Sequence, residues 1–275
     1  MGVTHVVVTP FAFQRALDDV DVQWRDLDRT LTDADLLQCA ADASSLGMAV
    51  VLKPHIWCSA FGRSGASRQD ILPDPARGGW AAWLDSYTAF LVAQARLAAQ
   101  MDATMLVVGL EYLQATTQVP GAWAAVAQAC RAEFGGALTY AANWWQEVDA
   151  FADWQAFDVI GVNAYYPLTV AGTPTAASVA QAWAPHLTSL GALAAREDRK
   201  IVFLEAGLPA VSGALTEPWN SGLTGAEDLE LQAIYVDGLM RAALPQPWFS
   251  GVCWWKWHTD APRSSRHHGP EPYRL

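Results

Sequence analysis

Short runs rich in β-branched residues alternate with longer helical stretches along this chain of 275 residues. The alternation is typical of a parallel sheet whose strands are joined through helices. Most runs are apolar on both faces, as expected for strands that helices cover. The seven strands expected from this pattern are Val3–Thr9, Ala49–Pro54, Thr104–Gly109, Ala137–Ala142, Val159–Ala164, Ile201–Glu205 and Gly251–Trp255.

Helices are expected between these strands. The first has Thr32 and Asp33 as candidate N-caps and ends at Gly47. The expected helices are Thr32–Leu46, Trp80–Gln100, Trp123–Glu133, Ala176–Arg196 and Ala226–Ala243.

The length matches a (β/α)8 barrel, which keeps a single core at this size. The chain has no internal repeat and no linker, so residues 1–275 are expected to form one domain. Only seven strands are visible, the chain opens almost directly on a strand, and residues 260–275 carry no strand pattern. We therefore expect an α/β fold, a TIM (β/α)8-type barrel that lacks its first strand and helix in this chain.

Composition argues against several classes of protein. The net charge of −11 argues against nucleic-acid binding, which needs a basic face. No run of 18 apolar residues is present, which argues against a transmembrane helix. The 14 tryptophans are an unusually large number for the chain. Tryptophan rings stack on sugar faces, although about half of these residues are expected to lie in the core.

The four cysteines lie apart from one another, and no Cys/His or His/Asp cluster has metal-ligand spacing. Free, mostly buried thiols are expected, with neither a metal nor an organic cofactor. The first ten residues resemble a strand, with no basic region or cleavage site of a signal peptide. The protein is expected to be cytoplasmic, or exported through a signal upstream of this chain.

Two strands carry a glutamate at their carboxyl ends, where barrel enzymes hold their catalytic groups. Glu111 follows the third expected strand and Glu205 ends the sixth. Either one alone could pair with a basic loop residue, because burying a lone carboxylate is costly. Two such glutamates among Trp, Tyr, Asn and His residues indicate glycosidic bond cleavage, which requires paired carboxyl groups.

Five segments resemble glycoside hydrolase family 113, and together they extend the resemblance from Val3 to about Trp257. They are Gly-Leu-Glu-Tyr at 109–112, Leu-Thr-Tyr-Ala-Ala-Asn-Trp at 138–144, Phe-Asp-Val-Ile-Gly-Val-Asn-Ala-Tyr-Tyr-Pro-Leu at 157–168, Phe-Leu-Glu-Ala-Gly at 203–207 and Gly-Val-Cys-Trp-Trp-Lys-Trp at 251–257. The resemblance implies a retaining barrel hydrolase with endo-β-1,4-mannanase activity. It places the acid/base on the fourth barrel strand and the nucleophile on the seventh, which agrees with one strand missing in front.

By this resemblance Glu111 is the general acid/base and Glu205 the nucleophile of a double displacement. Glu111 then holds its proton until the first step, while Glu205 is ionised. Many related enzymes carry Asn before the acid/base, where it contacts the sugar 2-hydroxyl. Leu110 stands there in this chain and cannot make that contact, so Asn143 or Asn163 is a candidate to replace it.

Several strand-end residues are candidates for substrate binding, each with a structural alternative. Tyr165 could hydrogen-bond the nucleophile or be a core tyrosine. His55 and Lys53 could bind hydroxyl groups, although Lys53 could equally form an interior ion pair. The tryptophans considered as sugar platforms are Trp144, Trp145, Trp219, Trp255 and Trp257. Some of them could face the core instead, because alternate residues of a strand point to opposite sides.

The expected partner is a polysaccharide or oligosaccharide, bound by a monomer, with no nucleic acid and no membrane. Three functions remain open from the sequence: hydrolysis of β-1,4-mannan or manno-oligosaccharides, the same chemistry on xylan or galactan, and carbohydrate binding by a catalytically impaired barrel. Leu110 favours the last, whereas the intact Glu111 and Glu205 argue against it.

Overall fold

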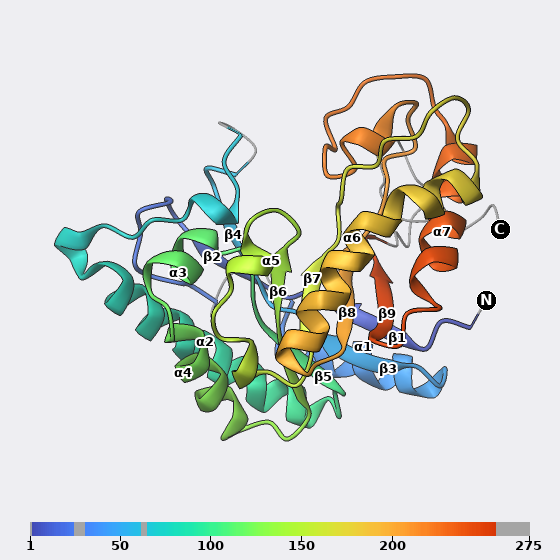
Figure 1. Ribbon diagram of the computed structural model, residues 1–275. Coiled ribbons are helices and arrows are strands. Elements are labelled where there is room, and N and C mark those ends of the chain that lie inside the picture. Colours follow the sequence, from blue (N-terminus) through green and yellow to red (C-terminus); the bar gives the residue numbers. More distant parts are fainter. Residues whose placement is uncertain (1, 25–30, 62–64, 257–275) are drawn as a thin grey trace. The chain divides into compact units, whose positions relative to one another are not determined.

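The computed structural model describes residues 2–24, 31–61 and 65–256. By its internal contacts the chain divides into two compact units, Met1–Ile160 and Gly161–Leu275. Figure 1 shows the elements of both units in sequence colours. The single domain expected over 1–275 stays a prediction.

Seven strands in the described part of the chain belong to one parallel sheet, in the order β1-β3-β5-β6-β7-β8-β9. They are β1 (His5–Val8), β3 (Ala49–Leu52), β5 (Met105–Leu110), β6 (Ala137–Asn143), β7 (Ile160–Asn163), β8 (Ile201–Ala206) and β9 (Phe249–Trp254). Each lies within about two residues of a strand expected from the sequence. Strands that follow one another across a parallel sheet are typical of a (β/α) barrel.

Two further short strands extend the first unit beyond the ends of β1 and β3. They are β2 (Phe11–Gln14) and β4 (His55–Cys58), which pair in parallel as a separate two-stranded sheet. Neither segment is among the strands expected from the sequence. At four residues each, they are too short for hydrophobic periodicity to distinguish them from the preceding strands.

Helices α1 (Asp33–Ser45), α2 (Gly79–Gln100) and α4 (Ala122–Arg131) follow the strands of the first unit as expected. Helix α1 begins with a capping box, in which Thr32 and Asp35 each accept a hydrogen bond from the other's backbone amide. Two short helices were not expected, α3 (Leu113–Gln118) and α5 (Glu147–Ala150). Both follow strand ends, and both carry residues of the site.

Stacked aromatic rings fill the core of the first unit. Trp83 stacks on Tyr87 with ring centroids 4.8 Å apart, and Tyr112 stacks on Trp123 at 5.7 Å. All four side chains are almost fully buried. Gly109 of β5 lies against this cluster, since a Cβ there would come within 2.6 Å of Trp123. The end of β5 is therefore held close to the aromatic core.

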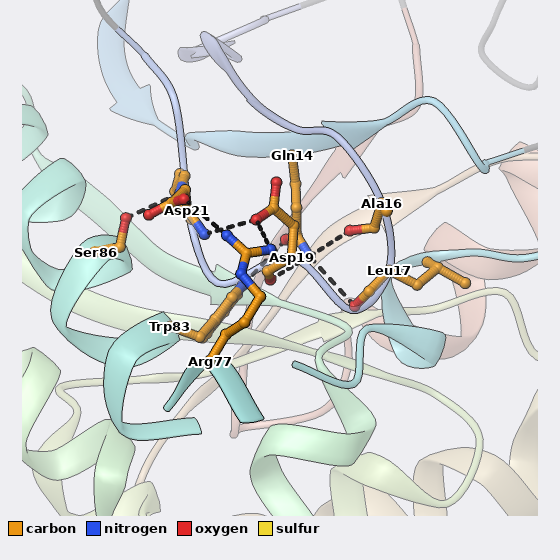
Figure 2. A network of polar contacts seen from close by, with 9 residues as sticks. Gln14, Ala16, Leu17, Asp19, Asp21, Arg77, Trp83 and Ser86 are labelled. Atoms are coloured by element: carbon orange, nitrogen blue, oxygen red, sulfur yellow. Dashed lines mark hydrogen bonds and ion pairs between the residues drawn. The ribbon is translucent and has the colours of Figure 1, made fainter. Parts of the chain in front are cut away.

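A buried glutamine organises the loop that follows β2. Nε2 of Gln14 donates hydrogen bonds to the carbonyl groups of Ala16, Leu17 and Asp19, at 2.8, 3.3 and 3.0 Å. Its Oε1 accepts from the indole nitrogen of Trp83 at 3.0 Å. Figure 2 shows this side chain within the loop.

Arg77 ties the same loop to the segment before α2. It donates to Asp19 at 2.8 Å and to Asp21 at 3.1 Å (Figure 2). The amide of Val22 also donates to the Ser86 hydroxyl on α2. Residues 14–22 are thus fixed by polar contacts rather than by regular structure.

The second unit carries α6 (Ala176–Glu197) and α7 (Leu229–Ala243), which pack against each other. They approach closely because Gly238 on α7 lies beside Val179, where a Cβ would come within 2.5 Å. Strand β8 pairs in parallel with β9.

No helix among the described residues is both long and apolar enough to cross a membrane. The four cysteines all lie in the described ranges and form no disulfide. Cys58 and Cys130 are buried as expected, whereas Cys39 on α1 is exposed.

Candidate active site

Glu111 lies directly after β5 at an irregular point of the sheet. From the pair Val107–Thr139 to the pair Leu110–Ala141, β5 advances three residues while β6 advances two. Glu111 itself has φ = 56°, in the left-handed region that favours glycine. Its amide donates to Ala141 at 3.1 Å, and its side chain is partly buried. Bulges and strained backbone both turn side chains toward functional sites.

A second carboxyl group, which the sequence analysis missed, belongs to Glu147 at the start of α5. It is fully buried and accepts three hydrogen bonds: from the Asn143 amide at 2.7 Å, the Tyr140 hydroxyl at 2.7 Å and the Thr116 hydroxyl at 3.2 Å. Burial raises the pKa of Glu147 to about 8, and the charge of Glu111 adds to the rise, whereas the hydrogen bonds oppose it.

The end of β6 presents Asn143 and two tryptophans. Oδ1 of Asn143 accepts from the Trp145 amide at 2.9 Å, and its side chain is partly buried. Trp144 is partly buried as well, while Trp145 is 52% exposed. Of the two tryptophans, Trp145 therefore presents the more accessible ring.

His55 opens β4 and is almost fully buried. Its Nδ1 lies 3.0 Å from the guanidinium group of Arg68. Lys53 is also fully buried, so the structure places it in the interior of the first unit.

Trp57 follows His55 by two residues and is 45% exposed. Its ring makes edge contacts with Phe11 at 6.5 Å and with Phe61 at 5.9 Å. Arg68 lies over the Phe61 ring at 5.8 Å. Of these aromatic side chains, Trp57 on β4 is exposed, Phe11 on β2 is partly buried and Phe61 is buried.

In the second unit, Glu205 lies one residue before the end of β8, also at a register shift. From the pair Phe203–Val252 to the pair Ala206–Trp254, β8 advances three residues while β9 advances two. The side chain is 6% exposed. Glu205 therefore lies within a stretch where its strand has one residue more than its neighbour, whereas Glu111 directly follows such a stretch.

The hydroxyl group of Tyr165 donates to Oε2 of Glu205 at 2.9 Å. Tyr165 follows β7 and is 7% exposed. This is the contact that the sequence analysis considers for Tyr165. Asn163, the last residue of β7, is fully buried.

The remaining tryptophan candidates of this unit differ in exposure. Trp219 is 45% exposed in a loop whose turn is held by hydrogen bonds from Asn220 to Glu217 and from Gly222 to Asn220. Trp255 is partly buried, with the Lys256 ammonium group 5.6 Å from its ring centre. Trp257 lies outside the described residues.

Three residues with functional geometry were missed from the sequence: Trp57, Arg68 and Glu147. A signal existed for Trp57, because it belongs to a strand-end segment rich in aromatic residues. No signal existed for Arg68 and Glu147, whose partners are distant in sequence or become apparent only once the chain has folded. The tryptophans that form core instead are Trp83, Trp123, Trp154 and Trp183.

Comparison with known proteins identifies the same family that the strand-end motifs resemble. The model of glycoside hydrolase family 113 matches residues 1–275. A solved complex of a family 113 β-1,4-mannanase is 26% identical, with a TM-score of 0.82 over 97% of this chain and 82% of that chain. The family 113 β-mannanase AaManA from Alicyclobacillus acidocaldarius, in complex with ManMIm, is 25% identical, with a TM-score of 0.83 and the same coverage.

A structure described as one of two fungal β-1,4-galactanases is 13% identical, with a TM-score of 0.57 over 98% of this chain and 83% of that chain. At that identity it shows the fold alone. No curated protein sequence matches the chain.

The predicted fold class is confirmed, as an α/β fold of the TIM-barrel type with seven parallel strands in the described residues. The predicted class of enzyme is confirmed too, since the matching family consists of glycoside hydrolases and the similar structures are β-1,4-mannanases. The chain belongs to glycoside hydrolase family 113, as its strand-end motifs implied.

Proposed function

We propose that this protein hydrolyses β-1,4-linked mannan or manno-oligosaccharides with retention of anomeric configuration. The observation that carries the proposal is the similar setting of the two glutamates near their strand ends: Glu111 directly follows a register shift, and Glu205 lies within one. Retaining hydrolysis needs two carboxyl groups roughly 5–5.5 Å apart across the scissile bond. We expect an experimental structure with a bound oligosaccharide to give this separation.

In the first step a carboxylate oxygen of Glu205 forms a bond to the anomeric carbon. The bond between that carbon and the glycosidic oxygen breaks, and Glu111 gives its proton to the departing oxygen. In the second step Glu111 takes a proton from water, whose oxygen bonds to the anomeric carbon and releases Glu205. The second step returns both carboxyl groups to their starting states.

Mannan is the proposed substrate because of family membership and the 25–27% identity to structures described as β-1,4-mannanases. Leu110 is fully buried, so it makes no contact with a sugar hydroxyl. Asn143 supports the proposal better than the fully buried Asn163 as the group that binds the 2-hydroxyl, because its side chain is partly exposed beside Glu111's strand.

The remaining candidates have supporting roles. Tyr165 orients Glu205 through its hydrogen bond. The partly buried Trp144 and Trp255 and the exposed Trp219 would stack on sugar rings. The buried His55 would act through Arg68 rather than as an open hydroxyl-binding group.

Reducing-sugar release from mannan, xylan and galactan tests the proposal. Mannan should be the preferred substrate, and Glu111→Gln and Glu205→Gln should each lose nearly all activity. Glu133→Gln is the matched control, because Glu133 pairs with Arg96 at the surface of the first unit. Activity unaffected by both catalytic substitutions would refute the roles, and preference for xylan or galactan would refute the substrate.

Stereochemistry gives a second, independent measurement. Proton NMR of the first product should show the β-anomer before mutarotation. A 2-deoxy-2-fluoro mannoside should leave a covalent adduct on the peptide that contains Glu205. Release of the α-anomer would exclude the double displacement.

A further inference from the structure

Glu147 is a buried carboxyl group to which the proposed reaction assigns no step. Its side chain has no solvent exposure. In the described part of the chain its hydrogen-bond donors are one backbone amide and two hydroxyl groups, rather than a basic side chain. Burying a carboxyl group without a cation is costly, so a group kept in this way calls for an explanation in terms of function.

Hydrogen bonds connect Glu147 to the backbone that carries Glu111. The Tyr140 hydroxyl donates to Oε1 of Glu147 at 2.7 Å and accepts from the Tyr112 amide at 2.8 Å. That amide belongs to the peptide unit immediately after Glu111. Because Glu111 has φ = 56°, this peptide must be held in an unfavourable conformation, and Tyr140 is the group that holds it.

The other oxygen of Glu147 holds the end of the neighbouring strand. Oε2 accepts from the Asn143 amide at 2.7 Å, at the last residue of β6. One carboxyl group therefore connects the ends of β5 and β6, which carry Glu111 and Asn143. Thr116 on α3 donates to Oε1 at 3.2 Å and ties this helix to the same centre.

Glu147 and Glu111 also interact through charge. The charge of Glu111 raises the pKa of Glu147, in addition to the larger effect of burial. Because its pKa is raised to about 8, Glu147 is mostly protonated near neutral pH, so its influence on Glu111 comes through the hydrogen bonds. The titratable groups that face Glu147 are Glu111 after β5 and Tyr140 on β6, while α3 presents the non-titratable Thr116.

We propose that Glu147 is a positioning residue for Glu111, which aligns the acid/base through Tyr140. The proposal rests on the function assigned to Glu111 above. It predicts that Glu147 affects the rate of chemistry rather than the binding of substrate.

The kinetic test compares Glu147→Gln with wild type and with the surface control Glu133→Gln. Glu147→Gln should lower kcat about 10- to 100-fold with KM changed by less than about 3-fold, because misaligning a catalytic group affects the chemical step. Glu133→Gln should match wild type in both kcat and KM.

Tyr140→Phe tests the alignment directly. It removes the hydroxyl that joins Glu147 to the Tyr112 amide but leaves the carboxyl group and the ring that stacks on Phe151. We expect a similar loss of kcat with little change in KM. This variant also decides the alignment role if Glu147→Gln does not fold.

Amide hydrogen exchange tests the positioning role of Glu147 independently of enzymatic activity. In Glu147→Gln the Tyr112 and Asn143 amides should exchange about tenfold faster than in wild type, as expected for a weakened hydrogen bond. If the wild-type protein is inactive on every glycan, the proposed function is contradicted. Amide hydrogen exchange alone then decides the positioning role. Unchanged kcat and unchanged amide exchange in a folded Glu147→Gln would overturn the inference.

Discussion

The hydroxyl group of Tyr165 lies 2.9 Å from Oε2 of Glu205 and donates a hydrogen bond to it. Both side chains are at least nine-tenths buried, so little water competes for the contact. A hydroxyl group that donates to a carboxylate makes a charge-assisted hydrogen bond, which fixes the orientation of the carboxylate. A fixed orientation is what a nucleophile at Glu205 requires.

Removing this hydroxyl group should slow the reaction. Tyr165→Phe keeps the ring, and loss of a hydrogen bond to a charged group costs about 1.5–3 kcal/mol. We expect kcat/KM on a manno-oligosaccharide to fall about 10- to 100-fold with little change in thermal stability. Tyr235→Phe, which changes a buried tyrosine on α7, is the control and should keep its activity. Equal losses in the two variants would show that the effect is structural.

Gly109→Ala should destabilise the first unit. The added methyl group would lie 2.6 Å from Trp123 and 2.7 Å from Tyr140, inside the aromatic core. Overpacking of this kind costs about 1–3 kcal/mol, measured as the free energy of unfolding in urea. Gly135→Ala meets nothing within 4 Å and should leave that free energy nearly unchanged. A Gly109→Ala protein as stable as wild type would contradict the packing described for the end of β5.

Gln14→Leu should loosen the loop at residues 15–22. The substitution removes three donated hydrogen bonds and leaves the Trp83 indole nitrogen without its acceptor. A buried group deprived of its partner costs about 1–3 kcal/mol. Limited proteolysis should therefore cut this loop faster than in wild type. Gln38→Leu is the control, because Gln38 is exposed and bonds only to Asp42 on the same helix. Matching cleavage rates in the two variants would count against the role of Gln14.

The ionisation of Glu147 should make stability depend on pH. Its pKa in the folded protein is about 8, well above the value of about 4.3 for an unperturbed glutamate. The folded state therefore binds the extra proton, and its stability is greatest below the lower value and falls as pH rises through the higher one. Free energies of unfolding in urea at about pH 5 and about pH 8 measure this fall. Glu147→Gln should reduce it, and an equal fall in both proteins would show that Glu147 does not titrate in this range.

Most regular structure could be predicted because it depends on local pattern. The strand expected at Thr104–Gly109 is β5 at Met105–Leu110, and Thr32 begins α1 with a capping box. The elements that were missed are short. Helix α5 has four residues and β4 has four, which is less than the periodicity needs. Their ends are set by contacts with other segments.

The candidate site was predicted only in part, because local pattern marks some of its residues and not others. Glu111 and Glu205 stand out because they interrupt apolar strands, and Tyr165 follows a strand directly. Glu147 has no such signal, because its donors on α3 and β6 are gathered only by folding. Trp145 and Trp123 are the same residue type, yet one is 52% exposed and the other 1%.

The sequence by itself determined the succession of strands and helices, the family, and the positions at which two glutamates end their strands. Tertiary structure alone decided the register shifts beside Glu111 and Glu205, the enclosure of Glu147 and which indole rings face solvent. The physical reason is the separation along the chain over which each kind of interaction acts. Periodicity and capping act within a few residues, whereas burial and hydrogen bonding join groups far apart along the chain.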